Sequence, residues 1–129
     1  MLAAAGSEKG ASRAIFTLAP WQNWKLLTSP YALDETNRNI SRLPLTAAES
    51  WQSLQSQVEM VTDVFALDRP SIFTTAKDRP ILFTALAWAE VLLTLDRSDF
   101  AGLLGSTFYG LHVLLPYAFL QREREAGNL

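Results

Sequence analysis

Five titratable side chains are the candidates for chemistry in this chain. They are one histidine and four carboxylates: His112, Glu90, Asp78, Asp96 and Asp99. Only the imidazole of His112 ordinarily titrates near neutral pH, so it would act as the general acid or base beside a neighbouring carboxylate. His112 lies among apolar residues, however, and a lone histidine in such a stretch is more often a core residue than a catalyst.

The rest of the composition gives little support to catalysis. The chain contains no cysteine and one histidine, which argues against disulfide frameworks, cysteine nucleophiles and the usual zinc centres. It also has no glycine-rich phosphate loop and no Gly-x-Ser-x-Gly elbow. On two antiparallel helices, Glu90 and His112 would differ in height by about 8 Å, which is too far for direct contact. We therefore expect no enzymatic activity, no cofactor and no metal site.

The elements that would carry these residues begin after a weakly ordered N-terminus. A chain of 129 residues, 49% hydrophobic and 19% charged, is typical of one folded domain. We expect residues 1–13 to form a flexible end and residues 14–129 to form a single helical domain. The apolar run at the N-terminus is too short for the core of a secretory signal, which favours a cytoplasmic protein. Residues 34–45 are polar and predict a loop.

Three tryptophans are the candidate partner-binding residues: Trp21, Trp24 and Trp51. The first two lie in an aromatic-rich segment that Pro20 and Pro30 interrupt, so we expect irregular structure there. Such residues bury a large area, either as a lid over the protein's own core or against another protein.

The middle of the chain predicts a first amphipathic helix. Thr46 and Glu49 match a capping box, which places the start of the helix at about Ala47. Apolar residues then follow at steps of three and four: Trp51, Leu54, Val58, Val61 and Phe65. This spacing predicts one buried stripe on a helix over 47–65.

A short duplication follows. Asp68-Arg69-Pro70 recurs as Asp78-Arg79-Pro80, and proline in the first turn after an acidic residue is typical of a helix start. The two Asp-Arg pairs could bind an anionic group, but surface caps and ion pairs are the favoured interpretation.

Two further helices are predicted over 80–95 and over 100–120, with a break or kink near Pro116. Gly102, Ser106 and Gly110 recur every four residues in the second helix, so we expect them to form a helix-packing face that another helix approaches closely.

Residues 80–120 also allow a membrane interpretation. The twenty-one uncharged residues of 100–120 are long enough to span a bilayer, and with 80–95 they could form a transmembrane hairpin. His112 and Pro116 lower the insertion tendency of this stretch, and the first helix is short and contains Glu90. A small membrane-anchored subunit therefore remains the second choice.

Nucleic-acid binding is a further alternative. The basic residues that would have to converge are Arg38, Arg42, Arg69, Lys77 and Arg79. Acidic residues accompany nearly all of them, and the formal net charge of -2 supplies no overall attraction to phosphate. A helical subunit of a ribonucleoprotein complex is thus weakly supported.

The sequence as a whole predicts an all-α protein, a small helical bundle of about four helices with an irregular, aromatic-rich N-terminal segment. Four tryptophans and seven phenylalanines are more than one small core requires. We therefore expect a non-catalytic protein-binding module that acts as an adaptor, accessory subunit or inhibitor within a larger assembly. Its partner would be another protein or a second copy of the chain.

Overall fold

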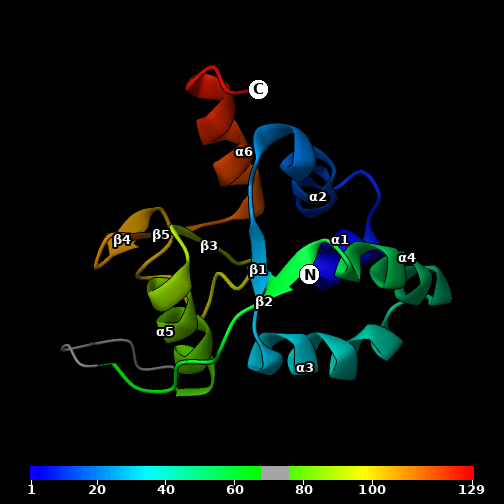
Figure 1. Ribbon diagram of the computed structural model, residues 1–129, viewed down its shortest axis with the longest axis horizontal. Helices are drawn as coiled ribbons and strands as arrows, with labels where there is room; N and C mark the ends of the chain where they lie inside the picture. Colours follow the sequence, from blue (N-terminus) through cyan, green and yellow to red (C-terminus); the bar gives the residue numbers. More distant parts are fainter. Residues whose placement is uncertain (68–75) are drawn as a thin grey trace.

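The computed structural model of the protein describes residues 1–67 and 76–129. The described residues form six α-helices, two short 3-10 helices and five strands (Figure 1). The helices are α1 (Leu2–Gly6), α2 (Ala11–Gln22), α3 (Pro30–Asn39), α4 (Leu45–Gln55), α5 (Arg79–Trp88) and α6 (Pro116–Glu125), with η1 (Ile40–Arg42) and η2 (Ala76–Asp78). The strands are β1 (Leu26–Thr28), β2 (Val58–Met60), β3 (Val91–Leu93), β4 (Ser106–Phe108) and β5 (Leu111–Leu114). The fold is therefore mixed, and the prediction of an all-α helical bundle is wrong.

The strands form two small sheets. Strands β1 and β2 pair in parallel, with Leu26 opposite Val58, and α3, η1 and α4 connect them. The second sheet has the order β3-β5-β4, in which β5 is parallel to β3 and antiparallel to β4. Helix α5 packs against this second sheet and covers it.

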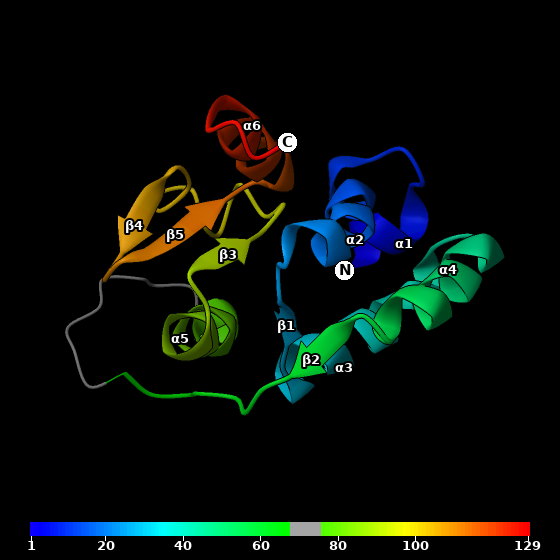
Figure 2. The same ribbon diagram turned by 45° about the horizontal axis from the view of Figure 1, so that its top comes forward.

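Buried apolar side chains gather in three clusters. The first joins α5 to the three-stranded sheet and comprises Leu82, Phe83, Phe100, Phe108, Leu111 and Val113. The second joins α1, α2 and α4 and comprises Ala4, Ala5, Phe16, Ala47, Trp51 and Leu54. The third lies between α2, α6 and the end of β5 and comprises Ile15, Leu114, Phe119 and Leu120. Figure 2 shows the resulting position of α2, between α6 on one side and α1 and α4 on the other.

The N-terminal segments are more regular than expected. Residues 1–13, expected to be a flexible end, contain α1 and the first residues of α2, and Ala4 is fully buried against α4. The aromatic-rich segment that follows is helical in α2 up to Gln22, with Pro20 in the last turn of the helix, so the prediction of irregular structure is wrong there. The chain then turns at Asn23, and residues 23–25 belong to neither a helix nor a strand before β1 begins. Most of the loop predicted over 34–45 is also helical, in α3 and η1. The hydroxyl of Ser29 caps α3 by accepting a hydrogen bond from the amide of Ala32.

The helix predicted over 47–65 is half as long as expected. Helix α4 ends at Gln55, and the chain turns at Ser56 before β2 pairs with β1. Trp51 and Leu54 are buried as the stripe requires, whereas Phe65 is exposed. Val58 is β-branched and packs well in a strand, so pairing with β1 overrides the helical spacing.

The helix predicted over 80–95 begins with Pro80 in its first turn, as expected, but ends at Trp88. Val91 starts β3, which pairs in parallel with β5. A short run of apolar residues that is covered on both faces shows no hydrophobic periodicity that would distinguish a helix from a strand. The same residues therefore fit a buried helix or a buried strand.

The helix predicted over 100–120 is replaced by a turn, a hairpin and α6. Tyr109 and Gly110 form the two-residue loop between β4 and β5, and their φ angles are 48° and 89°. Positive φ at both central residues is the mark of a type I′ turn, which usually contains Asn-Gly or Asp-Gly. Tyrosine in the first position conceals this signal in the sequence. A boundary at Pro116 is present as predicted, because α6 begins there, but the element before it is β5 and not a helix.

The described residues contain no helix with both the length and the apolar character that crossing a bilayer requires. The helical hairpin considered for residues 80–120 does not form, because β3, β4 and β5 occupy its centre.

Substitution of Gly110 tests the hairpin turn. Because the added methyl group of Gly110→Ala meets open space, its cost comes from the φ of 89°. We expect a loss of about 1–2 kcal/mol in the free energy of unfolding, measured by chemical denaturation. Gly102→Ala is the matched control, since its methyl group also meets open space and Gly102 has no left-handed φ. Equal destabilisation of both variants would instead favour the close helix packing predicted from their spacing.

Candidate functional site

Three aspartates from two separate segments meet beside the start of α5. Asp78 immediately precedes α5, and Asp96 and Asp99 lie in the turn that follows β3. One carboxylate oxygen of each residue lies within 4.8 Å of those of the other two. We call these three residues the aspartate cluster.

The turn that carries Asp96 and Asp99 is fixed by local hydrogen bonds. The amide of Asp96 donates to Thr94 Oγ1 at 3.0 Å, and the amide of Asp99 donates to Asp96 Oδ1 at 2.8 Å. The next residue, Phe100, is buried in the cluster of apolar residues between α5 and the sheet. Packing of this ring therefore holds the two carboxylates against the start of α5.

Asp78 is the most enclosed member of the cluster. Only 6% of its surface is exposed, and its Oδ2 atom is buried without a hydrogen-bond partner. Although Asp78 is the N-cap residue of α5, its side chain makes no capping hydrogen bond. The carboxylate turns toward Asp96 and Asp99 instead of the helix amides, which is unusual for an acidic residue at this position.

The pKa values of Asp78 and Asp99 are shifted in opposite directions. Burial raises the pKa of Asp78 to about 7, and hydrogen bonding to Asp99 and the negative charges of Asp99 and Asp96 act in the same direction. Hydrogen bonds with Asp78 and Asp96 lower the pKa of Asp99, and the nearby Lys77 ammonium lowers it further. The ammonium Nζ of Lys77 lies 3.4 Å from Asp99 Oδ2, and this contact raises the pKa of the lysine. The cluster can therefore hold a proton between Asp78 and Asp99, or a cation among all three.

The histidine and glutamate singled out in the sequence lie at the end of β3 opposite to the aspartate cluster, because Glu90 immediately precedes β3 and His112 lies in β5. The amide of His112 donates to the carbonyl of Glu90 at 3.1 Å, so the two residues are neighbours at the β3–β5 pairing and do not lie on separate helices. Together with Tyr109 they line a hollow of about 390 Å³. All three side chains are exposed, and water has ready access to them. General acid–base chemistry is favoured where water is excluded, so we assign no catalytic step to this hollow.

The three tryptophans predicted to bind a partner have different surroundings. Trp21 is 83% exposed at the end of α2. Trp24 is half-buried, with its ring 4.9 Å from that of Phe119. Trp51 is buried, and its indole N–H donates to Asn37 Oδ1 at 3.1 Å. Among these three, Trp21 has the surface that a partner could reach.

The predicted helix-packing residues are not on a helix. Gly102 lies in the turn before β4, Ser106 begins β4, and Gly110 lies in the hairpin turn. Apart from the adjacent residues of the chain, no atom of the described residues lies within 4 Å of the position that a Cβ would take at Gly102 or Gly110. The side chain of Ser106 donates to the carbonyl of Leu103 at 2.9 Å.

Two of the basic residues considered for nucleic-acid binding are paired with aspartates. Arg38 pairs with Asp34 at 3.1 Å, and Lys77 pairs with Asp99. Arg69 lies outside the described residues. Acidic partners thus accompany these two cations in space as they do in the sequence.

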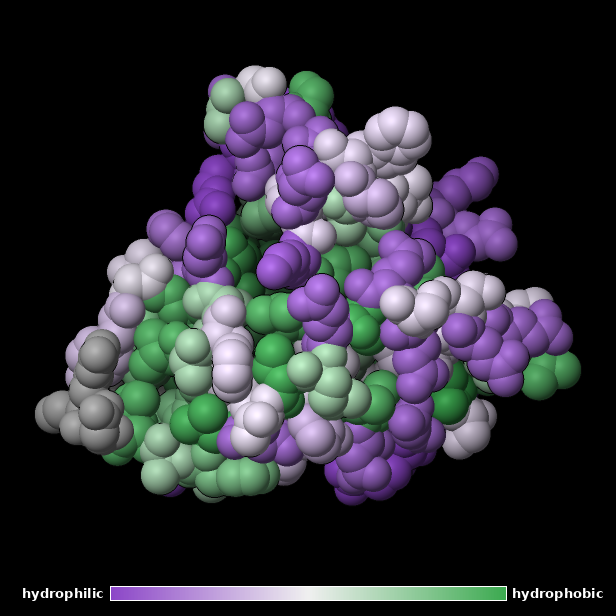
Figure 3. All heavy atoms as spheres, in the orientation of Figure 1, coloured by the Kyte–Doolittle hydropathy of each residue, from purple (hydrophilic) through white to green (hydrophobic). Residues whose placement is uncertain are grey.

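An exposed apolar surface was missed by the sequence analysis. Large side chains of β2, of the segment after it and of α5 are exposed: Met60 by 53%, Phe65 by 64% and Trp88 by 52%. We call these three residues the apolar face. Figure 3 shows hydrophobic residues gathered over α5 and the segment that follows β2. The helical spacing over 47–65 predicts burial of Phe65, and it gives no indication for Met60 or Trp88.

No family model matches this chain, and no curated protein or solved structure is significantly similar to it. Function is therefore inferred from the chain's own residues.

The raised pKa of Asp78 makes a prediction about stability. Between the ordinary pKa of 3.8 and the folded pKa of about 7, the folded protein holds a proton that the unfolded chain has released. The contribution of Asp78 to the free energy of unfolding therefore falls as the pH rises from about 4 to about 7. Asp78→Asn has no carboxyl group to titrate at this position. As the pH rises from about 4 to about 7, the free energy of unfolding of the variant should therefore rise relative to that of the wild type.

Chemical denaturation in EDTA at a series of pH values measures this difference. Asp99 titrates below the range because its pKa is lowered, and Asp34→Asn controls for the loss of one carboxylate outside the cluster. A difference between Asp78→Asn and the wild type that stays constant with pH would contradict the burial of a protonated Asp78.

Proposed function

We propose that this chain is a non-catalytic protein-binding module that uses its apolar face to join a larger assembly, as a cytoplasmic adaptor, accessory subunit or inhibitor. The observation that supports this is the exposure of three large apolar side chains, Met60, Phe65 and Trp88, on neighbouring elements. Exposed apolar side chains of this size, when they are gathered on one surface, are typical of protein contacts.

The backbone that carries the apolar face is held in place. The indole N–H of Trp88 donates to the carbonyl of Thr62 at 3.0 Å, and the amide of Val64 donates to Thr84 Oγ1 at 2.7 Å. These two bonds tie the segment after β2 along α5. A surface fixed in this way loses little conformational entropy when a partner binds, which favours affinity.

Aromatic contacts extend the apolar face toward α3. The ring of Phe65 lies 6.2 Å from the ring of Tyr31, at an interplanar angle of 78°. The amide of Tyr31 donates to the carboxylate of Asp63, with the nearer oxygen at 3.1 Å, and its hydroxyl donates to the carbonyl of Lys77. Tyrosine, tryptophan and phenylalanine are the side chains most enriched at protein interfaces, and a few of them usually supply most of the binding energy.

The other candidate functions have less support. The membrane-anchored subunit required a helical hairpin over 80–120, and strands occupy that region instead. The ribonucleoprotein subunit required several cations on one surface, and Arg38 and Lys77 are each paired with an aspartate. Binding at Trp21, which the sequence favoured, is kept as an alternative outcome of the experiment below.

Substitution of Phe65 tests the proposal. Because this side chain is largely exposed, Phe65→Ser should change the free energy of unfolding by less than about 0.5 kcal/mol. Loss of a central aromatic contact should weaken partner binding by about 2 kcal/mol, which is about thirtyfold in Kd. The tagged full chain is cross-linked in the native cell, and the partner is recovered with it. The Kd of the purified pair is then measured by titration.

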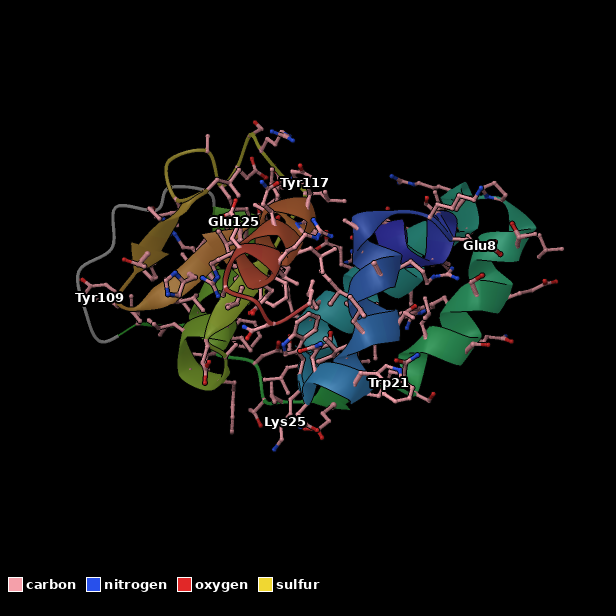
Figure 4. All side chains as sticks on the ribbon, turned by 90° about the horizontal axis from the view of Figure 1, so that it is seen from above. Glu8, Trp21, Lys25, Tyr109, Tyr117 and Glu125 are labelled. Carbon is pink, nitrogen blue, oxygen red and sulfur yellow. The ribbon has the colours of Figure 1, made fainter. Side chains whose placement is uncertain are left out.

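Trp21→Ser is the matched control. Trp21 is also an exposed aromatic residue, and Figure 4 shows it at the end of α2, in the other half of the molecule from Tyr109. The proposal requires that a partner bound by the wild type be retained by Trp21→Ser and lost by Phe65→Ser. The reverse result would place the contact on α2. A partner that both variants retain would exclude the apolar face, and a concentration-dependent dimer would identify the partner as a second copy.

A further inference from the structure

The aspartate cluster has the geometry of a cation site. Two oxygen atoms that bind one Ca²⁺ ion at about 2.4 Å can lie at most about 4.8 Å apart. One oxygen each from Asp78, Asp96 and Asp99 meets this condition pairwise. Three carboxylates at this separation repel one another strongly unless a positive charge or a proton lies between them.

A second observation points to a ligand. The Oδ2 atom of Asp78 is buried without a hydrogen-bond partner, and Asp78 as a whole is 6% exposed. A buried carboxylate oxygen without a partner is unfavourable, because it has lost its water without replacing those bonds. A cation held among the three carboxylates would restore that interaction.

We propose that Asp78, Asp96 and Asp99 bind a divalent cation of the oxygen-preferring class, with Ca²⁺, Mg²⁺ and Mn²⁺ as the members to test. The charge of the site suits such an ion, because three carboxylates and the adjacent Lys77 ammonium leave two negative charges in excess. The lysine side chain is 73% exposed and can move aside as the ion enters. The ligand atoms of these three residues are hard carboxylate oxygens, which disfavours zinc and copper.

The ion would link two parts of the fold that are separate in sequence. Asp78 precedes α5, whereas Asp96 and Asp99 belong to the turn after β3. Cation binding therefore fastens the start of α5 to the edge of the three-stranded sheet. This inference does not depend on the apolar face, and each can fail without the other.

Carboxylate ligands must be deprotonated to bind a cation, so binding is measured at about pH 8, where protons compete least with the ion.

The experiment is thermal unfolding of the full chain after EDTA treatment and dialysis, with each cation added up to about 10 mM. We expect Tm to rise by about 10 °C when the cation reaches about one hundred times its Kd. The rise should disappear in Asp99→Asn and remain in Asp34→Asn, which removes an exposed aspartate paired with Arg38.

Paramagnetic broadening by Mn²⁺ tests the same site without a variant. In the wild-type protein, the amide signals of residues 76–79 and 96–100 should broaden before the others. No Tm change with any of the three cations would overturn the proposal, as would equal changes in the two variants or broadening elsewhere. A proton shared between Asp78 and Asp99 would then account for the cluster.

Discussion

Strand β5 pairs with a neighbour on each side, and the C-terminal half of the described structure depends on that pairing. Val113 lies opposite Leu92 of β3 and Ser106 of β4, and its side chain is fully buried. Strands β3 and β4 have three residues each, which is too short for either to persist without the strand between them. Helix α5 completes the unit by covering the buried face with Leu82 and Phe83. Removal of any one of these elements would expose the side chains that hold the other three.

The same pairing arranges both groups of titratable residues. Beyond β3 the ladder continues through the amide of Thr94, which donates to the carbonyl of Leu114 at 3.0 Å, and the chain then enters the turn that carries Asp96 and Asp99. Burial of Phe100 prevents this turn from moving away from Asp78. The mutual repulsion of the three carboxylates is thus opposed by apolar packing and by backbone hydrogen bonds. At the other end of β3, the bond from His112 to Glu90 explains why these residues became neighbours although a helical interpretation separated them.

Two helix starts could be predicted from the sequence, whereas the helix ends and the strands that follow them could not. Pro80 and Pro116 lie in the first turns of α5 and α6, as proline in a sequence predicts, because its ring and missing N–H suit that position. The strands could not be predicted, since each is three or four residues long and its apolar residues also fit a helical period. The type I′ turn was hidden by Tyr109, where asparagine would have indicated it. The three aspartates were recognised as titratable, but their meeting depends on sheet pairing between distant residues, for which local spacing carries no information. Exposure of Phe65 and Trp88 was missed for the same reason.

Helix α2 places neighbouring residues in different cores. Ile15 packs with Phe119 and Leu120 of α6, while the next residue, Phe16, packs with Trp51 and Leu54 of α4. Each half of the chain is near the lower size limit at which a core is stable by itself. A helix that belongs to both cores makes the loss of one unfavourable for the other, so this short segment supplies much of the cooperativity with which the protein folds and unfolds.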